Sequence, residues 1–67
     1  MKALKITGCT DSLMWYSKRV GKLVPYLRTH SDCYMSLEPA GYKNIVHLKD
    51  AEVVEVTEDE FNNPDNY

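Results

Sequence analysis

The chain has 67 residues, of which 43% are hydrophobic and 27% are charged. A chain of this length makes one small domain with a limited core, and its composition excludes a fully disordered or membrane-embedded protein. No apolar run approaches the roughly 18 residues of a membrane-spanning helix, and the first residues lack the apolar core of a secretory signal, so we expect a cytoplasmic protein.

The charges are divided unevenly along the chain. Eight Lys and Arg residues and four acids precede Ala51, so this first part has a net charge of +4. The remaining residues contain six acids and no base, a net charge of −6. A mildly basic body is therefore followed by an acidic end, which either solubilises the protein, shields a nucleic-acid surface or contacts a basic partner.

The chain begins with a predicted strand and a long loop. Residues 2 to 7 alternate Leu4 and Ile6 with less apolar side chains, which indicates a half-buried strand. Residues 8 to 13 contain Gly, Thr, Asp and Ser, whose local hydrogen bonds favour a loop. A short helical turn that begins near Asp11 is an alternative for the residues that follow.

The second expected strand spans residues 22 to 30. It is rich in β-forming side chains, but Pro25 has no backbone N–H and so predicts a sheet edge or a bulge. Ser31 and Asp32 then make a tight turn. In this part of the chain we assign four aliphatic residues to the core, namely Val20, Leu23, Val24 and Leu27.

Residues 33 to 38 have the clearest alternation in the chain, which places three apolar side chains on one face of a strand and three more polar ones on the other. The apolar set is Cys33, Met35 and Leu37. We expect Tyr34, on the other face, to point outward.

Two further strands are expected at residues 42 to 48 and 51 to 56, after a Pro-Ala-Gly turn at residues 39 to 41. We expect Val54 and Val56 to face inward. The composition then changes to Glu, Asp, Asn and Pro, which bury too little apolar area to offset the entropy of ordering, so the pattern predicts a mobile end.

Five short strands joined by loops too brief for crossover helices predict an antiparallel sheet. A small sheet protects its edges best by curling into a barrel. We therefore predict an all-β fold, a small five-stranded antiparallel SH3-like barrel over residues 1 to 57, followed by a flexible acidic tail over residues 58 to 67.

Three stretches carry a family resemblance: the opening strand, WYSKRVGKLVPY, and CYMSLEPAGYKNIVHLKDAEVVEV. Together, over roughly residues 2 to 57, they resemble small SH3-like barrel proteins of unassigned function encoded by tailed bacteriophages. The resemblance implies the fold, a viral source and residence in the host cytoplasm, and it implies no particular activity. RVGKLVPYL also resembles the Gly-centred loop of KOW-type barrels that bind RNA or ribosomal proteins, although the second glycine of that loop is missing.

No catalytic or metal-binding pattern is found. Two cysteines and two histidines provide the types of side chain that bind zinc, but their spacing is not that of a zinc site. These residues are Cys9, His30, Cys33 and His47. The glycines are single and far apart, so there is no phosphate-binding loop. We expect neither an enzyme, nor a cofactor, nor a metal.

Binding to another protein is the favoured function, because Trp and Tyr supply large rigid contact areas at low entropic cost. The predicted protein-binding residues are Trp15, Tyr16, Lys18, Arg19, Tyr34 and Tyr42. The partner would be a host or viral protein, and the chain would be a modulator of it. The strand that contains Pro25 is a candidate edge for adding a strand from a partner or from a second copy in a homodimer.

The alternatives are a single-stranded nucleic-acid-binding barrel restrained by its acidic tail, and a minor virion or assembly component. A nucleic-acid surface would combine stacking aromatics with cations along the backbone. The candidate cations are Lys18, Arg19, Lys22, Arg28 and Lys43.

Overall fold

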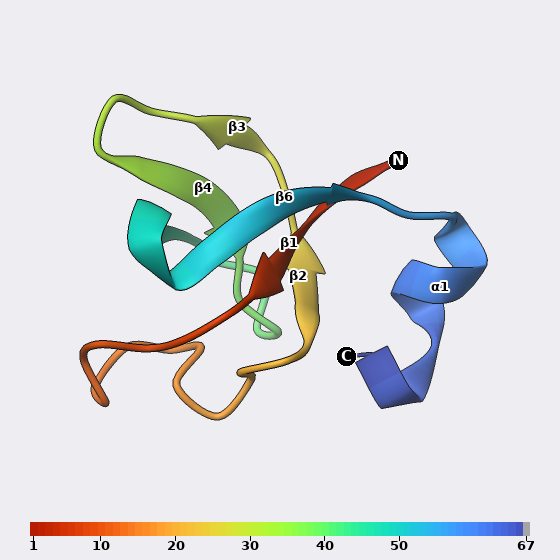
Figure 1. The fold of residues 1–67 in the computed structure, drawn as a ribbon, viewed down its shortest axis with the longest axis horizontal. Helices are drawn as coiled ribbons and strands as arrows, with labels where there is room; N and C mark the ends of the chain where they lie inside the picture. The colour runs from red at the N-terminus through yellow and green to blue at the C-terminus, as the bar shows by residue number, and fades with distance from the viewer. Residues whose placement is uncertain (67) are drawn as a thin grey trace.

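The computed structural model describes residues 1–66 and consists mainly of short antiparallel strands (Figure 1). Tyr67, the last residue of the predicted tail, lies outside the described residues. Within residues 1–66 the strands are β1 (Lys2–Ile6), β2 (Leu23–Pro25), β3 (Arg28–Thr29), β4 (Cys33–Leu37), β5 (Lys43–His47) and β6 (Ala51–Glu55). The helical elements are the 3-10 turn η1 (Leu48–Asp50), the helix α1 (Glu58–Asn62) and the 3-10 turn η2 (Pro64–Asn66). Within residues 1–66 no helix has the length and apolar character needed to cross a membrane.

The strands form two three-stranded sheets, with the orders β2-β1-β6 and β3-β4-β5. Each of the five expected extended segments contains a strand, so the all-β class is confirmed. Residues 22 to 30 provide two strands because the chain leaves the first sheet after Pro25 and enters the second at Arg28. The described strands do not close into the continuous barrel that we predicted.

The main core lies between the two sheets. Leu4, Ile6 and Val24 point into it from the first sheet, and Val46 meets them from the second. Tyr16 enters the same core from the long loop between β1 and β2 and is completely buried. The small core predicted from the chain length is therefore completed by an aromatic ring from a loop.

The β4 strand faces the core with its more polar side. Tyr34 and Ser36 share a face with the buried Val46 of β5, whereas Cys33, Met35 and Leu37 are on the other, outer face. The outward orientation that we predicted for Tyr34 is wrong. The reason is the bend at Pro25, whose carbonyl accepts a hydrogen bond of 2.6 Å from the Ser36 hydroxyl, so this strand needs a small donor on its inner face.

The outer face of the first sheet is also partly buried. Ala3 and Leu23 lie on the face opposite to Leu4, yet both are buried. Val54 and Val56 are on this outer side as well, and not inside the core as we predicted. They lie there because the register places Val54 opposite Ala3, one residue away from the inward-pointing Leu4.

The segment that we predicted to be a mobile tail contains the short helix α1. The Thr57 hydroxyl accepts a hydrogen bond from the Glu60 N–H, and the Glu60 carboxylate accepts one from the Thr57 N–H, which together make a capping box. Further along, the Lys22 ammonium donates to the Asp65 carbonyl at 2.5 Å. Local capping and this contact bring the acidic end back beside the first sheet.

One buried hydrogen bond joins the loop to the end of the second sheet. The Tyr16 hydroxyl donates to the Asp50 carboxylate at 2.5 Å and accepts from the His47 N–H at 3.3 Å. The Asp50 carbonyl also accepts hydrogen bonds from the N–H groups of Thr7 and Gly8, which follow β1. Asp50 therefore connects the long loop, η1 and the end of β1.

We predict that Tyr16→Phe lowers the free energy of unfolding by about 2 kcal/mol, because it leaves the buried Asp50 carboxylate without its donor. Urea unfolding followed by circular dichroism measures the change. Tyr42→Phe is the matched control, since Tyr42 is 70% exposed and its substitution should change stability by less than about 0.5 kcal/mol. Equal stability of the two variants would contradict the role given to Tyr16.

Candidate protein-binding surface

The Trp15–Tyr16 pair covers the free edge of β5. The Trp15 indole N–H donates to the Ile45 carbonyl at 2.9 Å, and the Tyr16 hydroxyl receives the His47 N–H. The two rings meet edge to face with their centroids 5.5 Å apart. Since Ile45 and His47 belong to β5, the two side chains take the hydrogen-bonding positions that a neighbouring strand would otherwise fill.

This use of the aromatic pair changes the predicted binding surface. Tyr16 is completely buried and cannot contact a partner, so its assignment to the surface is wrong. Trp15 packs against the core and its indole N–H is already bonded. Tyr34 also packs against the core and meets Tyr26 edge to face, with 6.2 Å between the ring centroids.

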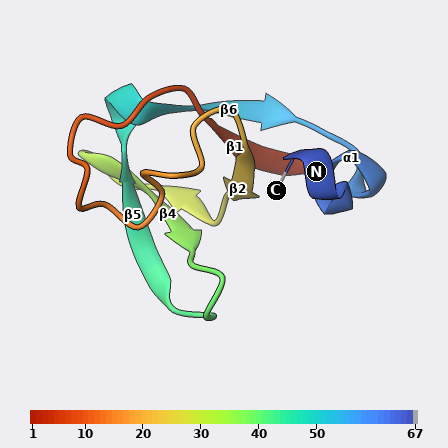
Figure 2. The same ribbon diagram turned by 90° about the horizontal axis from the view of Figure 1, so that it is seen from below.

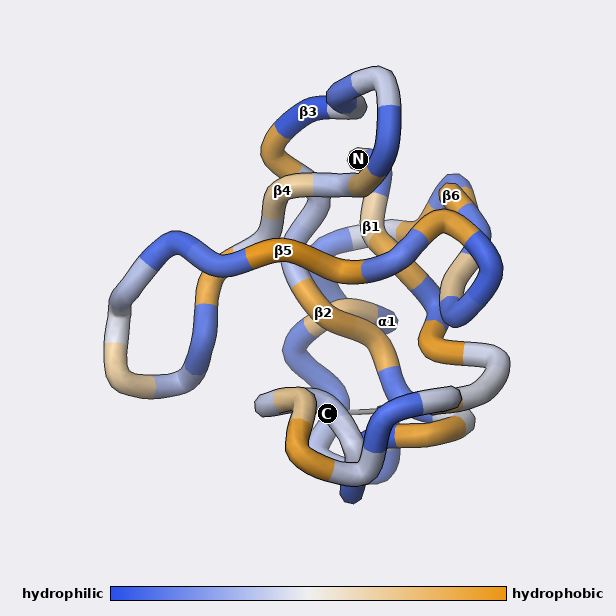
Figure 3. Tube along the Cα trace, turned by 90° about the vertical axis from the view of Figure 1, so that its left-hand side faces the viewer, coloured by the Kyte–Doolittle hydropathy of each residue, from blue (hydrophilic) through white to orange (hydrophobic). Residues whose placement is uncertain are grey.

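The other predicted binding residues are accessible but are not gathered in one place. Lys18 is exposed and Arg19 is partly exposed, both on the long loop between β1 and β2. Tyr42 is 70% exposed at the tip of the β4–β5 hairpin. Figure 3 shows that tip projecting from the molecule, well away from the loop. The six predicted residues therefore do not form a single surface.

Burial is the main reason that the pKa of the Tyr16 phenol is raised well above its ordinary value of about 10. The hydrogen bond to Asp50 adds to the rise, whereas the hydrogen bond from the His47 N–H acts against it. The phenol therefore stays neutral and keeps its proton for Asp50 throughout the physiological range. This is the behaviour of a structural donor.

A partly exposed apolar surface lies on the outer face of β3, β4 and β5. Residues that are opposite each other in an antiparallel pair share a face, and the register places Arg28, Met35 and Ile45 in one row and Leu37 and Lys43 in the next. Leu27, which is 41% exposed, precedes this row. We call these six residues the outer-face patch: Leu27, Arg28, Met35, Leu37, Lys43 and Ile45.

The centre of the outer-face patch is hollowed. Leu27, Arg28, Met35 and Lys43 line a depression of about 230 Å³. Its floor is apolar and its two charged residues are both cations. The nearby acid Glu38 accepts a hydrogen bond of 2.9 Å from the Asn44 amide on the other face of the hairpin. The arrangement suits a ligand that brings both apolar and acidic groups.

The sequence predicted two of the six residues of the outer-face patch as binding residues. Arg28 and Lys43 were among the candidate nucleic-acid contacts, but Leu27 was assigned to the core and Met35 was not singled out. The alternation of residues 33 to 38 was the signal that could have found Met35. It was misread because alternation separates the two faces of a strand without saying which of them is covered.

The remaining candidate cations lie elsewhere. Lys22 reaches the Asp65 carbonyl on the first-sheet side, and Lys18 and Arg19 are on the long loop. Of the aromatic rings that would stack on bases, Tyr16 is in the core, and Trp15, Tyr26 and Tyr34 are partly buried against it. The structure therefore does not bring the five candidate nucleic-acid cations together with a row of exposed aromatics.

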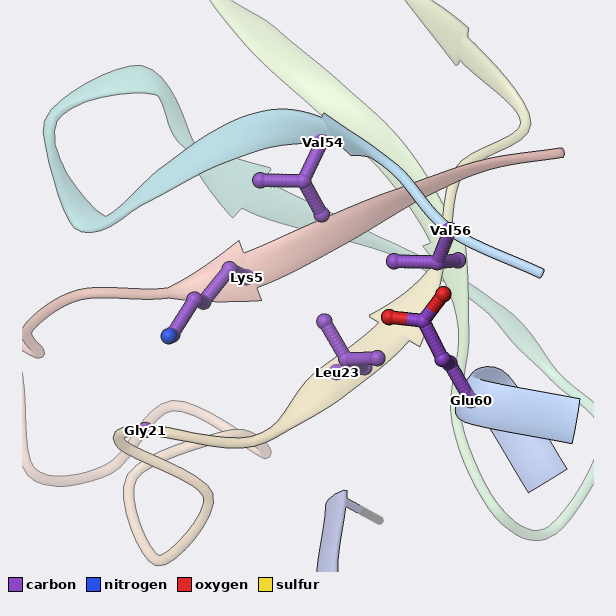
Figure 4. Close-up of a pocket in the computed structure, with 6 residues that line it drawn as sticks. All are labelled: Lys5, Gly21, Leu23, Val54, Val56 and Glu60. Atoms are coloured by element: carbon purple, nitrogen blue, oxygen red, sulfur yellow. The ribbon is translucent and has the colours of Figure 1, made fainter. Parts of the chain in front are cut away.

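A second hollow, of about 200 Å³, lies beside the outer face of the first sheet (Figure 4). Leu23, Val54 and Val56 form its apolar wall, with Lys5 on one side and Glu60 on the other. The Glu60 carboxylate is already an acceptor in the capping box with Thr57. Both hollows are smaller than the roughly 300 Å³ at which small-molecule sites begin.

The cysteine and histidine side chains are not gathered in one cluster. Cys9 and Cys33 are both free, and the Cys9 thiol donates to the Asp11 carbonyl at 2.9 Å. Cys33 and His47 occupy opposite positions on β4 and β5. Among residues 1–66 no group of three or more His, Cys, Asp or Glu side chains is arranged to hold a metal ion.

Comparisons of the chain with protein-family models, with curated proteins and with solved structures found no match.

We predict that the free energy of unfolding falls above about pH 10, where the unfolded chain releases the Tyr16 proton and the folded protein retains it. A raised pKa in the folded state stabilises the protein below the ordinary pKa, and this contribution is lost as the pH rises, by about 1.4 kcal/mol per pH unit. Urea unfolding between pH 8 and 11 should show this component in the wild-type protein and not in Tyr16→Phe. Parallel pH profiles of the two proteins would show that Tyr16 is not the group responsible.

Proposed function

We propose that this protein is a small SH3-like interaction module that binds an acidic, partly apolar segment of another protein through the outer-face patch. The supporting topology is a long first loop, a strand that bends from one sheet to the other at Pro25, two hairpins and the turn η1 before the last strand. The sequence resemblance to tailed-phage proteins adds that the partner would be a host or viral protein and the module its modulator.

The observation that carries the proposal is the composition and position of the outer-face patch. Four aliphatic or thioether side chains are partly or largely exposed on one sheet face, and the two charges among them are both positive. Exposed apolar patches with a polar rim are typical of binding surfaces. Arg and Met are also among the residues enriched at protein interfaces.

A protein partner fits this surface better than a nucleic acid. Single-stranded nucleic acids are bound by rows of exposed aromatics among cations, whereas Trp15, Tyr26 and Tyr34 pack against the core here. The acidic residues from Glu52 onward would also repel a phosphate backbone. Aliphatic side chains beside cations instead suit leucine or phenylalanine next to glutamate or aspartate in a partner.

We predict that Lys43→Glu and Met35→Asp each weaken partner binding at least tenfold, because the first reverses a charge in the patch and the second places a carboxylate in its apolar centre. The protein is immobilised, partners are captured from a lysate of the native host, and affinities are then measured with the purified partner.

Lys18→Glu is the matched control, since it makes the same charge change at an exposed position on the long loop. It should bind like the wild-type protein. All variants are first compared by circular dichroism and thermal unfolding. Loss of binding in Lys18→Glu together with wild-type binding in Lys43→Glu would move the binding surface to the loop and remove the outer-face patch from the proposal.

A further inference from the structure

The two sheets leave four strands at their edges, β2, β6, β3 and β5, among the residues described. An unpaired edge exposes a row of N–H and C=O groups that can pair with another chain, and proteins usually block such edges. The features that block pairing differ from edge to edge in this protein.

The β5 edge is blocked by side chains. The Ile45 N–H donates to the Asn44 side-chain oxygen at 2.8 Å, and the Ile45 carbonyl accepts from the Trp15 indole. The His47 N–H is bonded to the Tyr16 hydroxyl. An incoming strand would have to displace these contacts, one of which belongs to the buried group around Asp50.

The edges of β2 and β3 are blocked in another way. At the β2 edge, Pro25 has no N–H, and its carbonyl already accepts from the Ser36 hydroxyl. The edge that continues along β3 is only two residues long, Arg28 and Thr29. The strand that contains Pro25, which the sequence suggested as a pairing edge, is therefore a poor template for a partner strand.

Among the residues described, the β6 edge has no proline and no side chain bonded to its outward backbone groups. It has five residues and is hydrogen-bonded to β1 only, among the strands described. Val56 exchanges two hydrogen bonds with Met1, of 2.7 and 2.8 Å, and the Asp50 carbonyl accepts from the Thr7 N–H. Since backbone groups alternate along an antiparallel strand, the N–H and C=O groups of Ala51, Val53 and Glu55 point away from β1. Figure 2 shows β6 at the rim of the molecule, with β1 along one side.

We propose that the β6 edge binds an extended segment of a partner protein that carries basic and β-branched residues and adds a fourth strand to the first sheet. The charge of the edge identifies the partner. Glu52 and Glu55 are exposed on β6, where they lie opposite Lys5 and Lys2 of β1, and the Met1 ammonium is 3.2 Å from the Glu55 carboxylate. Glu58 and Asp59 follow, and the chain contains no Lys or Arg after Lys49, so the acids outnumber the bases along this edge. Val53, which is 39% exposed, offers an apolar contact at the middle of the edge.

The same charges disfavour a second copy as the occupant. Pairing β6 with β6 would bring two sets of glutamates together with no base from either strand, and like charges across a sheet destabilise it. This surface is separate from the outer-face patch, which is on the other sheet and attracts the opposite charge. The inference therefore goes beyond the proposed function and does not depend on it.

The test uses an eight-residue peptide that alternates lysine and valine, titrated into the ¹⁵N-labelled wild-type protein. We expect chemical-shift changes centred on Ala51, Val53 and Glu55 and slower hydrogen exchange of their amides, because these amides would enter new hydrogen bonds. The same peptide N-methylated at each residue keeps its side chains but has no backbone donors, and it should bind at least tenfold more weakly.

A charge-reversed pair tests the specificity. The double variant Glu52→Lys and Glu55→Lys should lose affinity for the lysine–valine peptide at least tenfold and should gain affinity for a glutamate–valine peptide. Lys43→Glu in the outer-face patch should leave both affinities unchanged, which separates this test from that of the proposed function.

Three results would overturn the inference. They are shift changes centred on the outer-face patch, equal binding of the methylated and unmethylated peptides, and the absence of binding by the folded wild-type protein. Sedimentation of the protein alone should give a monomer. A dimer in which the Val53 amide is protected from exchange would instead make a second copy the occupant.

Discussion

The hydrogen bond from the Tyr16 hydroxyl to the Asp50 carboxylate holds together parts of the chain that strand pairing alone does not connect. Tyr16 lies in the middle of a long loop, and Asp50 ends the 3-10 turn that leads from one sheet into the other. A buried carboxylate needs a hydrogen-bond donor and a buried phenol needs an acceptor. Each group therefore offsets the free-energy cost of burying the other. The core of so short a chain depends on this arrangement, because Tyr16 is the largest of the fully buried side chains.

The same arrangement determines which parts of the surface stay exposed. With Tyr16 inside the core, its neighbour Trp15 is placed over the edge of β5, and both rings are used for structure. The exposed surface that remains has two distinct features. One is the apolar and basic outer-face patch, and the other is the unblocked acidic edge of β6.

The uneven distribution of charge along the sequence corresponds to a separation of charge between these two surfaces. The cations of the patch lie on β3 and β5, whereas the acids of the last strand and of α1 belong to the other sheet and the segment that follows it. We propose that the two surfaces select partners of opposite charge, the patch an acidic apolar segment and the edge a basic extended one. Such a module would be able to hold two different segments at once.

The sequence by itself determined the strands and most of their limits. The reason is local: short runs of β-forming residues are separated by the turn-forming residues Gly, Pro, Asn and Asp. It also predicted a sheet edge or a bulge at Pro25, since the missing N–H is a local property, but it did not predict that the chain passes there from one sheet to the other. It did not determine which face of β4 is covered, because alternation has the same period whichever face is inside. Nor did it separate the buried Tyr16 from the exposed Tyr42. Tyr16 is held inside by its contact with Asp50, which is 34 residues away in the chain. The tertiary structure decided which faces and side chains are exposed, because burial depends on which distant segments pack against each other.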